Sequence, residues 1–148
     1  MNKGHIQLCS LSKYKDFKDN YTKKLFIVRN PMKVNCELYG MVHVPELAPS
    51  PELYKKYITR WKYNEFTQEE ENRLKDFGPG ATWWSLYYEQ FIAQMHEDYM
   101  QVNLARIIEL LNQGVDILLV CFCGNLEHCH RKILGDYYAS LGYEVRYR

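Results

Sequence analysis

The side chains most able to do chemistry are concentrated between Val120 and Arg131, near the C-terminal end of the chain. This stretch holds three of the five cysteines and two of the five histidines, which are Cys121, Cys123, His128, Cys129 and His130. An apolar run precedes the stretch and a helical pattern follows it, which predicts a strand, a short turn and the start of a helix. A helix N-terminus lowers the pKa of a nearby thiol and offers free N–H groups to an anion, so both thiol and anion chemistry are expected here.

Three consecutive residues at the helix start are the candidate catalytic groups. Cys129 could act as a nucleophile or a redox thiol, and the alternative is that it packs as a small buried residue. His130 could accept a proton from the thiol or orient it. Arg131 could hold an anion together with helix N–H groups, and the alternative is an ion pair with Glu127, one turn earlier. The apolar face of the helix, projected backwards, predicts that Cys129 and His130 point inward.

Polar residues at the ends of the predicted strands are the candidate ligand-binding groups. In parallel α/β sheets, ligands bind beyond the carboxyl ends of the strands. The candidates, including those of the turn, are Cys121, Cys123, His128, Arg29, Ser10 and Asn30. For Arg29 the alternative is that it caps its own loop. Together these groups predict a small polar pocket at one end of the sheet.

Zinc binding is a second chemistry that the same cysteines and histidines could support. The spacing differs from the paired Cys-x-x-Cys pattern of structural zinc sites. Neighbouring residues on a helix point about 100° apart, so His128, Cys129 and His130 cannot all converge on one ion. We therefore predict no metal and no other cofactor, and zinc binding remains an alternative.

Short apolar segments alternate with helical patterns, which predicts one α/β domain over residues 1–148. The expected architecture is a single three-layer domain in which a mostly parallel, Rossmann-like sheet is flanked by helices. Strands are predicted over residues 5–9, 25–28, 38–44, 117–121 and 144–147, the third of them as a strand or a sheet edge.

Capping residues predict helices that begin at Pro51 and just after Thr67. One long helix is expected over residues 85–113, although its apolar stripe shifts slightly in phase partway along. The last helix is expected to run to Leu141. Its predicted buried face consists of Ile133, Leu134, Tyr137, Tyr138 and Leu141.

The segment from Tyr54 to Tyr63 interleaves basic and aromatic residues and could contact a nucleic acid. Its aromatic residues fall on one helical face and its lysines on the other, so an amphipathic helix with a solvated rim is the favoured interpretation. The aromatic cluster at residues 83–88 could form core, or one wall of a pocket that stacks a planar ring.

Composition narrows the class of protein and its compartment. The net charge of +1 is no general signature of a nucleic-acid or membrane binder. The first residues lack the apolar run of a signal peptide, and the longest apolar run, 117–123, is too short to cross a bilayer. Five cysteines is an odd number, which favours reduced thiols over a disulfide framework. We expect a cytoplasmic protein without a membrane partner; its oligomeric state is left open.

The spacing of Cys121 from Cys129-His130-Arg131, behind an apolar strand, resembles the C-terminal signature of the domain-of-unknown-function family DUF488. The segment 46–53 and the aromatic start of the long helix are similar to one branch of that family. This chain departs from the pattern at Cys123, where the family often has an acidic residue or alanine, and at Leu126, where it often has proline. The resemblance implies a cytosolic α/β domain and names no substrate.

These observations predict an enzyme with a Cys-His-Arg pocket that acts on a small anionic or nucleotide-like ligand. The reaction class is left open. The alternative functions are a non-catalytic module that binds a nucleotide or nucleic acid, and a zinc-binding protein.

Overall fold

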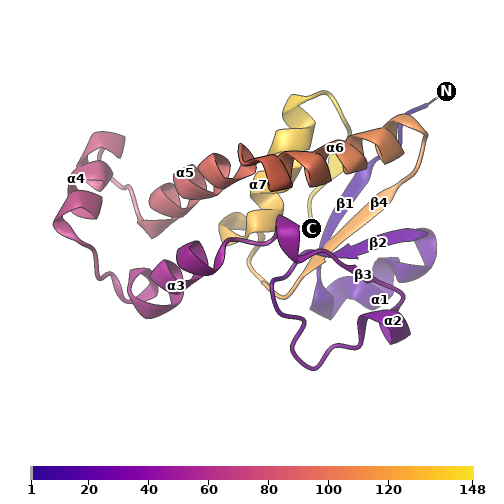
Figure 1. The fold of residues 1–148 in the computed structure, drawn as a ribbon, viewed down its shortest axis with the longest axis horizontal. Coiled ribbons are helices and arrows are strands. Elements are labelled where there is room, and N and C mark those ends of the chain that lie inside the picture. Colours follow the sequence, from indigo (N-terminus) through magenta and orange to yellow (C-terminus); the bar gives the residue numbers. More distant parts are fainter. Residues whose placement is uncertain (1) are drawn as a thin grey trace.

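One parallel sheet organises the chain in the computed structural model, which describes residues 2–148. Five strands lie in the order β3-β2-β4-β1-β5, and every pairing is parallel (Figure 1). The strands are β1 Ile6–Ser10, β2 Lys23–Phe26, β3 Val42–His43, β4 Ile117–Cys121 and β5 Val145–Arg146. The predicted α/β class is therefore confirmed.

The centre of the sheet is the pair β1 and β4, in which every residue is buried. Their register runs from Ile6 opposite Ile117 to Ser10 opposite Cys121. A strand that is covered on both faces has to be apolar along its whole length, and the run Ile117 to Cys121 meets this condition. The register places the last residue of each central strand, Ser10 and Cys121, side by side at the carboxyl edge.

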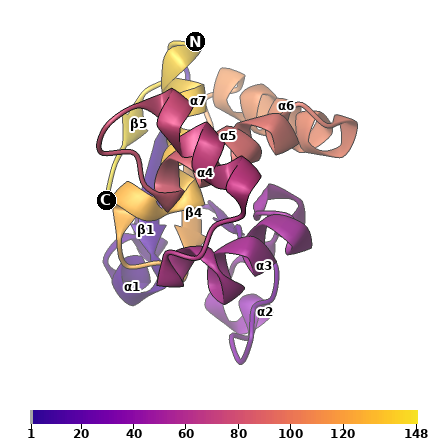
Figure 2. The same ribbon diagram turned by 90° about the vertical axis from the view of Figure 1, so that its left-hand side faces the viewer.

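Helices cover both faces of the sheet (Figures 1 and 2). On one face α6 and α7 pack together, and the Tyr138 hydroxyl donates to the Leu104 carbonyl oxygen at 2.9 Å. On the other face the short α1 and α2 are joined by a hydrogen bond from the Tyr14 hydroxyl to the Tyr39 carbonyl oxygen. The helices are α1 Tyr14–Phe17, α2 Cys36–Tyr39, α3 Pro51–Thr59, α4 Gln68–Phe77, α5 Trp83–Met95, α6 Asp98–Asn112 and α7 His130–Ser140.

Neighbouring strands β2 and β4 send the chain to opposite faces, because β2 leads to α2 and β4 leads to α7. In open α/β sheets such a divergence leaves a crevice at the carboxyl ends, where ligands bind. The residue after β2, Ile27, accepts a hydrogen bond from His130 of α7 at 2.7 Å. The cysteine-rich turn therefore lies at the expected edge of the sheet.

The single long helix predicted over residues 85–113 is wrong, since the chain forms α5 and α6 with a break at His96 and Glu97. Glu97 has extended backbone angles (φ −73°, ψ 148°) and begins α6 as its N-cap. The break rotates the buried stripe, so Met100 is fully buried whereas Tyr99 and Val102, which follow Met95 at helical spacing, are exposed. The phase shift in the sequence marked this break.

Two smaller predictions also need correction. The segment 38–44, predicted as a strand or a sheet edge, contains the end of helix α2 and then the two-residue strand β3, so the edge alternative is confirmed for Val42–His43 alone. Asn35 caps α2 by accepting from the Leu38 N–H, and Gly40 ends it in the left-handed region at φ 76°. In α7, Leu141 is 47% exposed rather than buried, because the helix ends at Ser140.

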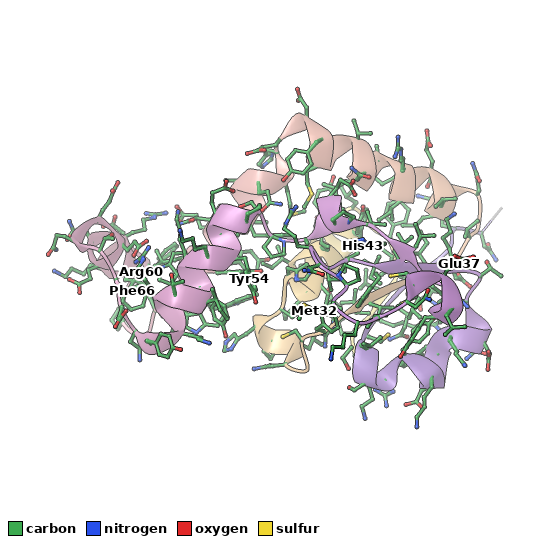
Figure 3. All side chains as sticks on the ribbon, turned by 60° about the horizontal axis from the view of Figure 1, so that its bottom comes forward. Met32, Glu37, His43, Tyr54, Arg60 and Phe66 are labelled. Atoms are coloured by element: carbon green, nitrogen blue, oxygen red, sulfur yellow. The ribbon has the colours of Figure 1, made fainter. Side chains whose placement is uncertain are left out.

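The helices α3 and α4 form an arm, residues 51–77, that extends away from the sheet (Figure 1). Ser50 caps α3, and Thr67 with Glu70 forms the predicted capping box of α4. Tyr54 and Arg60 lie on this arm, whereas His43 lies on β3 at the sheet edge (Figure 3). Along residues 2–148, every helix falls short of the length and apolarity that a membrane span requires.

Candidate functional site: a buried thiol cluster at the strand ends

The site is built on two cysteines from different elements. Cys121 is the last residue of β4, and Cys129 is the N-cap of α7, so the sheet and the helix position the two sulfurs independently. Their Sγ atoms lie 3.0 Å apart, and the two residues are 1% and 3% exposed. At this distance the two sulfur atoms can share a proton.

Arg131 lies in the first turn of α7 and points into the same cluster. Its Nη1 donates to Cys121 Sγ at 3.1 Å and to the carbonyl oxygen of Cys123. Its Nη2 donates to the backbone oxygen of Arg148 at 3.1 Å. The guanidinium is thus enclosed by the protein, and within residues 2–148 it pairs with sulfur and backbone oxygens instead of Glu127.

A backbone carbonyl group at the end of β2 holds His130 in one tautomer. Its Nε2 lies 2.7 Å from the carbonyl oxygen of Ile27, so Nε2 carries the hydrogen and donates it. Nδ1 is then left with a free lone pair, and it faces Cys129 Sγ at 3.9 Å. Burial lowers the pKa of His130, which keeps the ring neutral near pH 7 and able to accept a proton.

The environment separates the acidities of the two paired thiols. The hydrogen bond from Cys129, helped by the positive charge of Arg131, lowers the pKa of Cys121 to about 6 although burial opposes ionisation. Burial and the neighbouring thiols raise the pKa of Cys129. The pair therefore holds one proton and one negative charge near neutral pH, and that proton lies on Cys129.

The exposed turn over this pair carries Cys123 and His128. Cys123 is half-buried, and its Sγ lies 3.9 Å from the carbonyl oxygen of His128, the residue before Cys129. The nearby Cys129 thiol lowers the pKa of Cys123 to about 6. His128 is exposed, and its ring lies 5.4 Å from Trp83 and 5.3 Å from Trp84, so an aromatic surface borders the turn.

The remaining predicted ligand-binding residues make local contacts. Arg29 donates to the carbonyl oxygens of Pro49 and Pro45, which is the loop-capping alternative. The Ser10 and Ser12 hydroxyls lie 2.8 Å apart, and Asn30 accepts from the N–H of Met32. Ser10 still borders the site, because it is paired with Cys121 across the sheet.

Outside the cluster, the other cysteines have different environments. Cys9 is fully buried in β1, and burial raises its pKa to about 12, which keeps it protonated. Cys36 begins α2 and is partly exposed. Over the described residues 2–148, no three cysteine, histidine or carboxylate side chains gather closely enough to hold a metal ion.

The basic and aromatic residues of the arm mostly make structural contacts within the protein. Trp61 is fully buried, and Arg60 makes a two-bond ion pair with Glu70. Tyr54 and Tyr63 remain exposed on the rim. This arrangement agrees with the amphipathic interpretation of the segment.

Some residues that shape the site have no side-chain signal in the sequence. Ile27 and Arg148 contribute backbone oxygens, which any residue could supply, so only their positions in the fold matter. Tyr87 of α5 is buried close to all three thiols. Burial is the main cause that raises its pKa well above the ordinary value, and the thiols add to this effect. Its place in the aromatic cluster at the start of α5 was the available signal.

Comparison with known proteins finds a family model that matches part of the chain. Residues 70–141, which include the end of the arm, α5 to α7 and the thiol cluster, match the family model DUF488-N3a, described as the active DUF488-N3 subclade. No curated protein and no solved structure gives a significant match.

Proposed function

This chain belongs to the DUF488 family, and we propose that it is an enzyme whose reactive group is the thiolate shared by Cys121 and Cys129. Arg131 stabilises the negative charge, and His130 accepts the proton of Cys129 when that sulfur reacts. The description of the matched subclade as active supports an enzyme. Chemistry of this kind needs reduced thiols, which supports a cytoplasmic location.

The observation that carries the proposal is the burial of Arg131. Its side chain is 1% exposed, and a buried guanidinium without a negative partner is strongly unfavourable. Within residues 2–148 no aspartate or glutamate side chain pairs with it, whereas Cys121 Sγ lies 3.1 Å away. An ionised Cys121 supplies the negative partner that the buried guanidinium needs, and the guanidinium in turn stabilises the thiolate.

The substrate class we propose is a small anionic or nucleotide-like molecule. The rings of His128, Trp83 and Trp84 form an aromatic surface beside Cys123, and such a surface can stack a planar ring. The start of α7 provides the positive end of an eleven-residue helix at the same place. Both features support a ligand that carries a ring and a negative charge.

The pH dependence of thiolate absorbance tests the ionised Cys121. In a Cys123→Ser protein, which lacks the second thiol of low pKa, ultraviolet absorbance should show a thiolate that titrates with a midpoint near pH 6. Arg131→Gln should move this midpoint upwards by a pH unit or more, and Arg131→Lys should move it less because a positive charge remains. Arg106→Gln, which changes an exposed arginine of α6, is the matched control and should leave it unchanged. An unshifted midpoint in a folded Arg131→Gln protein would overturn the proposal.

A thermal-shift screen tests the substrate class. Nucleoside monophosphates and inorganic phosphate are the probes, since a ligand that binds only the folded state raises the melting temperature. We expect a nucleoside monophosphate to raise it more than phosphate, and we expect His128→Ala to remove the difference. Equal effects of both probes on the wild type would reject the nucleotide-like class.

A further inference from the structure

A third thiol lies beside the proposed reactive pair. The Sγ atoms of Cys121 and Cys129 are 3.0 Å apart, about 1 Å more than a disulfide bond. Cys123 Sγ approaches the same helix start, at 3.9 Å from the carbonyl oxygen that precedes Cys129. Cys129 therefore lies close to two cysteines, one at the end of β4 and one in the turn.

The three thiols differ in their access to solvent. Cys123 is half-buried in an exposed turn, and the neighbouring Gly124 has no atoms within 4 Å of the position a Cβ would take. Cys121 and Cys129 are nearly enclosed beneath it. A small molecule arriving from solution therefore meets Cys123 first, and the low pKa of that thiol, about 6, favours its reaction.

We propose that the cluster is a site of oxidation by hydroperoxides, in which Cys123 reacts first and a Cys121–Cys129 disulfide is the final product. This inference rests on the proposed function, because it adds a redox control to the same thiolate. Hydrogen peroxide is the simplest oxidant of the class.

The sequence of steps balances in atoms and electrons. The Cys123 thiolate attacks one peroxide oxygen, the O–O bond breaks, and the departing hydroxide takes a proton from solvent to form water. Cys129 then attacks the sulfur of the Cys123 sulfenic acid, the S–O bond breaks, and the hydroxide leaves as water with the Cys129 proton. Two electrons pass from the two cysteines to the peroxide.

The last step is an exchange without further oxidation. The Cys121 thiolate attacks the Cys129 sulfur, the bond between Cys123 and Cys129 breaks, and Cys123 leaves as a thiolate. Arg131 then loses the charged sulfur that it contacts at 3.1 Å. Oxidation in this way switches off the proposed reactive group, and a dithiol reductant restores it.

Mapping disulfides after treatment with hydrogen peroxide tests the relay. The whole protein is oxidised, its free thiols are blocked with N-ethylmaleimide, and its peptides are analysed by mass spectrometry. The wild type should give the Cys121–Cys129 disulfide, which dithiothreitol reverses. Cys123→Ser should form it at least tenfold more slowly. Cys121→Ser should stop at a Cys123–Cys129 disulfide, and Cys129→Ser should leave a Cys123 sulfenic acid that dimedone traps.

Cys36→Ser is the matched control, since Cys36 lies on α2 away from the cluster, and it should oxidise like the wild type. Absence of the Cys121–Cys129 disulfide from oxidised wild type would overturn the inference, and so would wild-type oxidation kinetics in Cys123→Ser. Failure of the relay differs from failure of the proposed function. In the first case the Cys121 thiolate of the Cys123→Ser protein still titrates near pH 6, and in the second that midpoint is lost.

Discussion

At the scale of single residues, the ionised thiol of Cys121 links the stability of the fold to pH. Its pKa is about 6 in the folded protein and about 9.0 in an ordinary environment, so the folded state holds this proton less tightly than the unfolded state does. A lowered acid pKa gives stability that is complete above pH 9 and is lost as pH falls to 6. The contribution changes by up to about 1.4 kcal/mol per pH unit inside this window.

Cys121→Ser should therefore cost more stability at pH 8.5 than at pH 6. Urea unfolding of the wild type and the variant at both pH values measures the difference, and Cys36→Ser serves as the reference for a thiol on a short surface helix. A penalty for Cys121→Ser that does not depend on pH would show that Cys121 is protonated in the folded protein.

The burial of the site residues could be predicted from local periodicity, whereas their contacts with distant parts of the chain could not. The inward direction of Cys129 and His130 follows from helical periodicity, and both are buried as expected. The partners of Arg131 could not be predicted, because Cys121 is ten residues away and Arg148 is seventeen residues away along the chain. Only the packing of α7 on the sheet brings them together. These side chains are nearly enclosed at the place where the sequence predicted a polar pocket.

At the scale of elements, an ion pair joins α4 to the end of α3 within the arm. Arg60 donates to both carboxylate oxygens of Glu70, at 2.6 and 2.9 Å, and Glu70 also accepts from the N–H of Thr67. The hydrogen bond from Arg60 is the main reason that the pKa of Glu70 falls to about 2. Glu70→Gln should destabilise the protein by about 1.5–3 kcal/mol, the usual range for a hydrogen bond to a charged group.

Thermal unfolding at pH 7 measures this loss. Glu69→Gln is the control, since it removes a charge from the same helix turn at an exposed position. The stability supplied by Glu70 should disappear as pH falls from 4.5 towards 2, because a lowered carboxyl pKa stabilises only the ionised form. Equal effects of the two substitutions would mean that the ion pair contributes nothing.

Elements with local signals were predicted well, and those set by tertiary contacts were not. Ser50 and Thr67 carry their caps in the sequence, so α3 and α4 begin where expected. The break between α5 and α6 has no glycine or proline, and its only signal in the sequence is the phase shift, which arises because two differently phased stripes bury separate faces. The strand β3 has only two residues, which is too short for a periodic pattern.

At the scale of the whole molecule, contacts across the chain predict that the arm and the sheet unfold together. Gln94 of α5 binds the backbone of the segment that enters α3, donating to Ala48 and accepting from Ser50, both at 2.8 Å. The ring of Phe91 lies 5.9 Å from that of His130. These contacts join α3, α5 and α7 in one packed unit.

The positions of the tryptophans make this testable. All three, Trp61, Trp83 and Trp84, lie in the arm or at the start of α5, whereas far-ultraviolet circular dichroism reports on every helix. Unfolding curves in urea should have the same midpoint by both probes. Leu119→Ala, a cavity in the fully buried centre of β4, should cost about 2–5 kcal/mol and move both midpoints equally. A fluorescence midpoint that Leu119→Ala leaves unchanged would mean that the arm folds independently of the sheet. The chain would then hold two cooperative units.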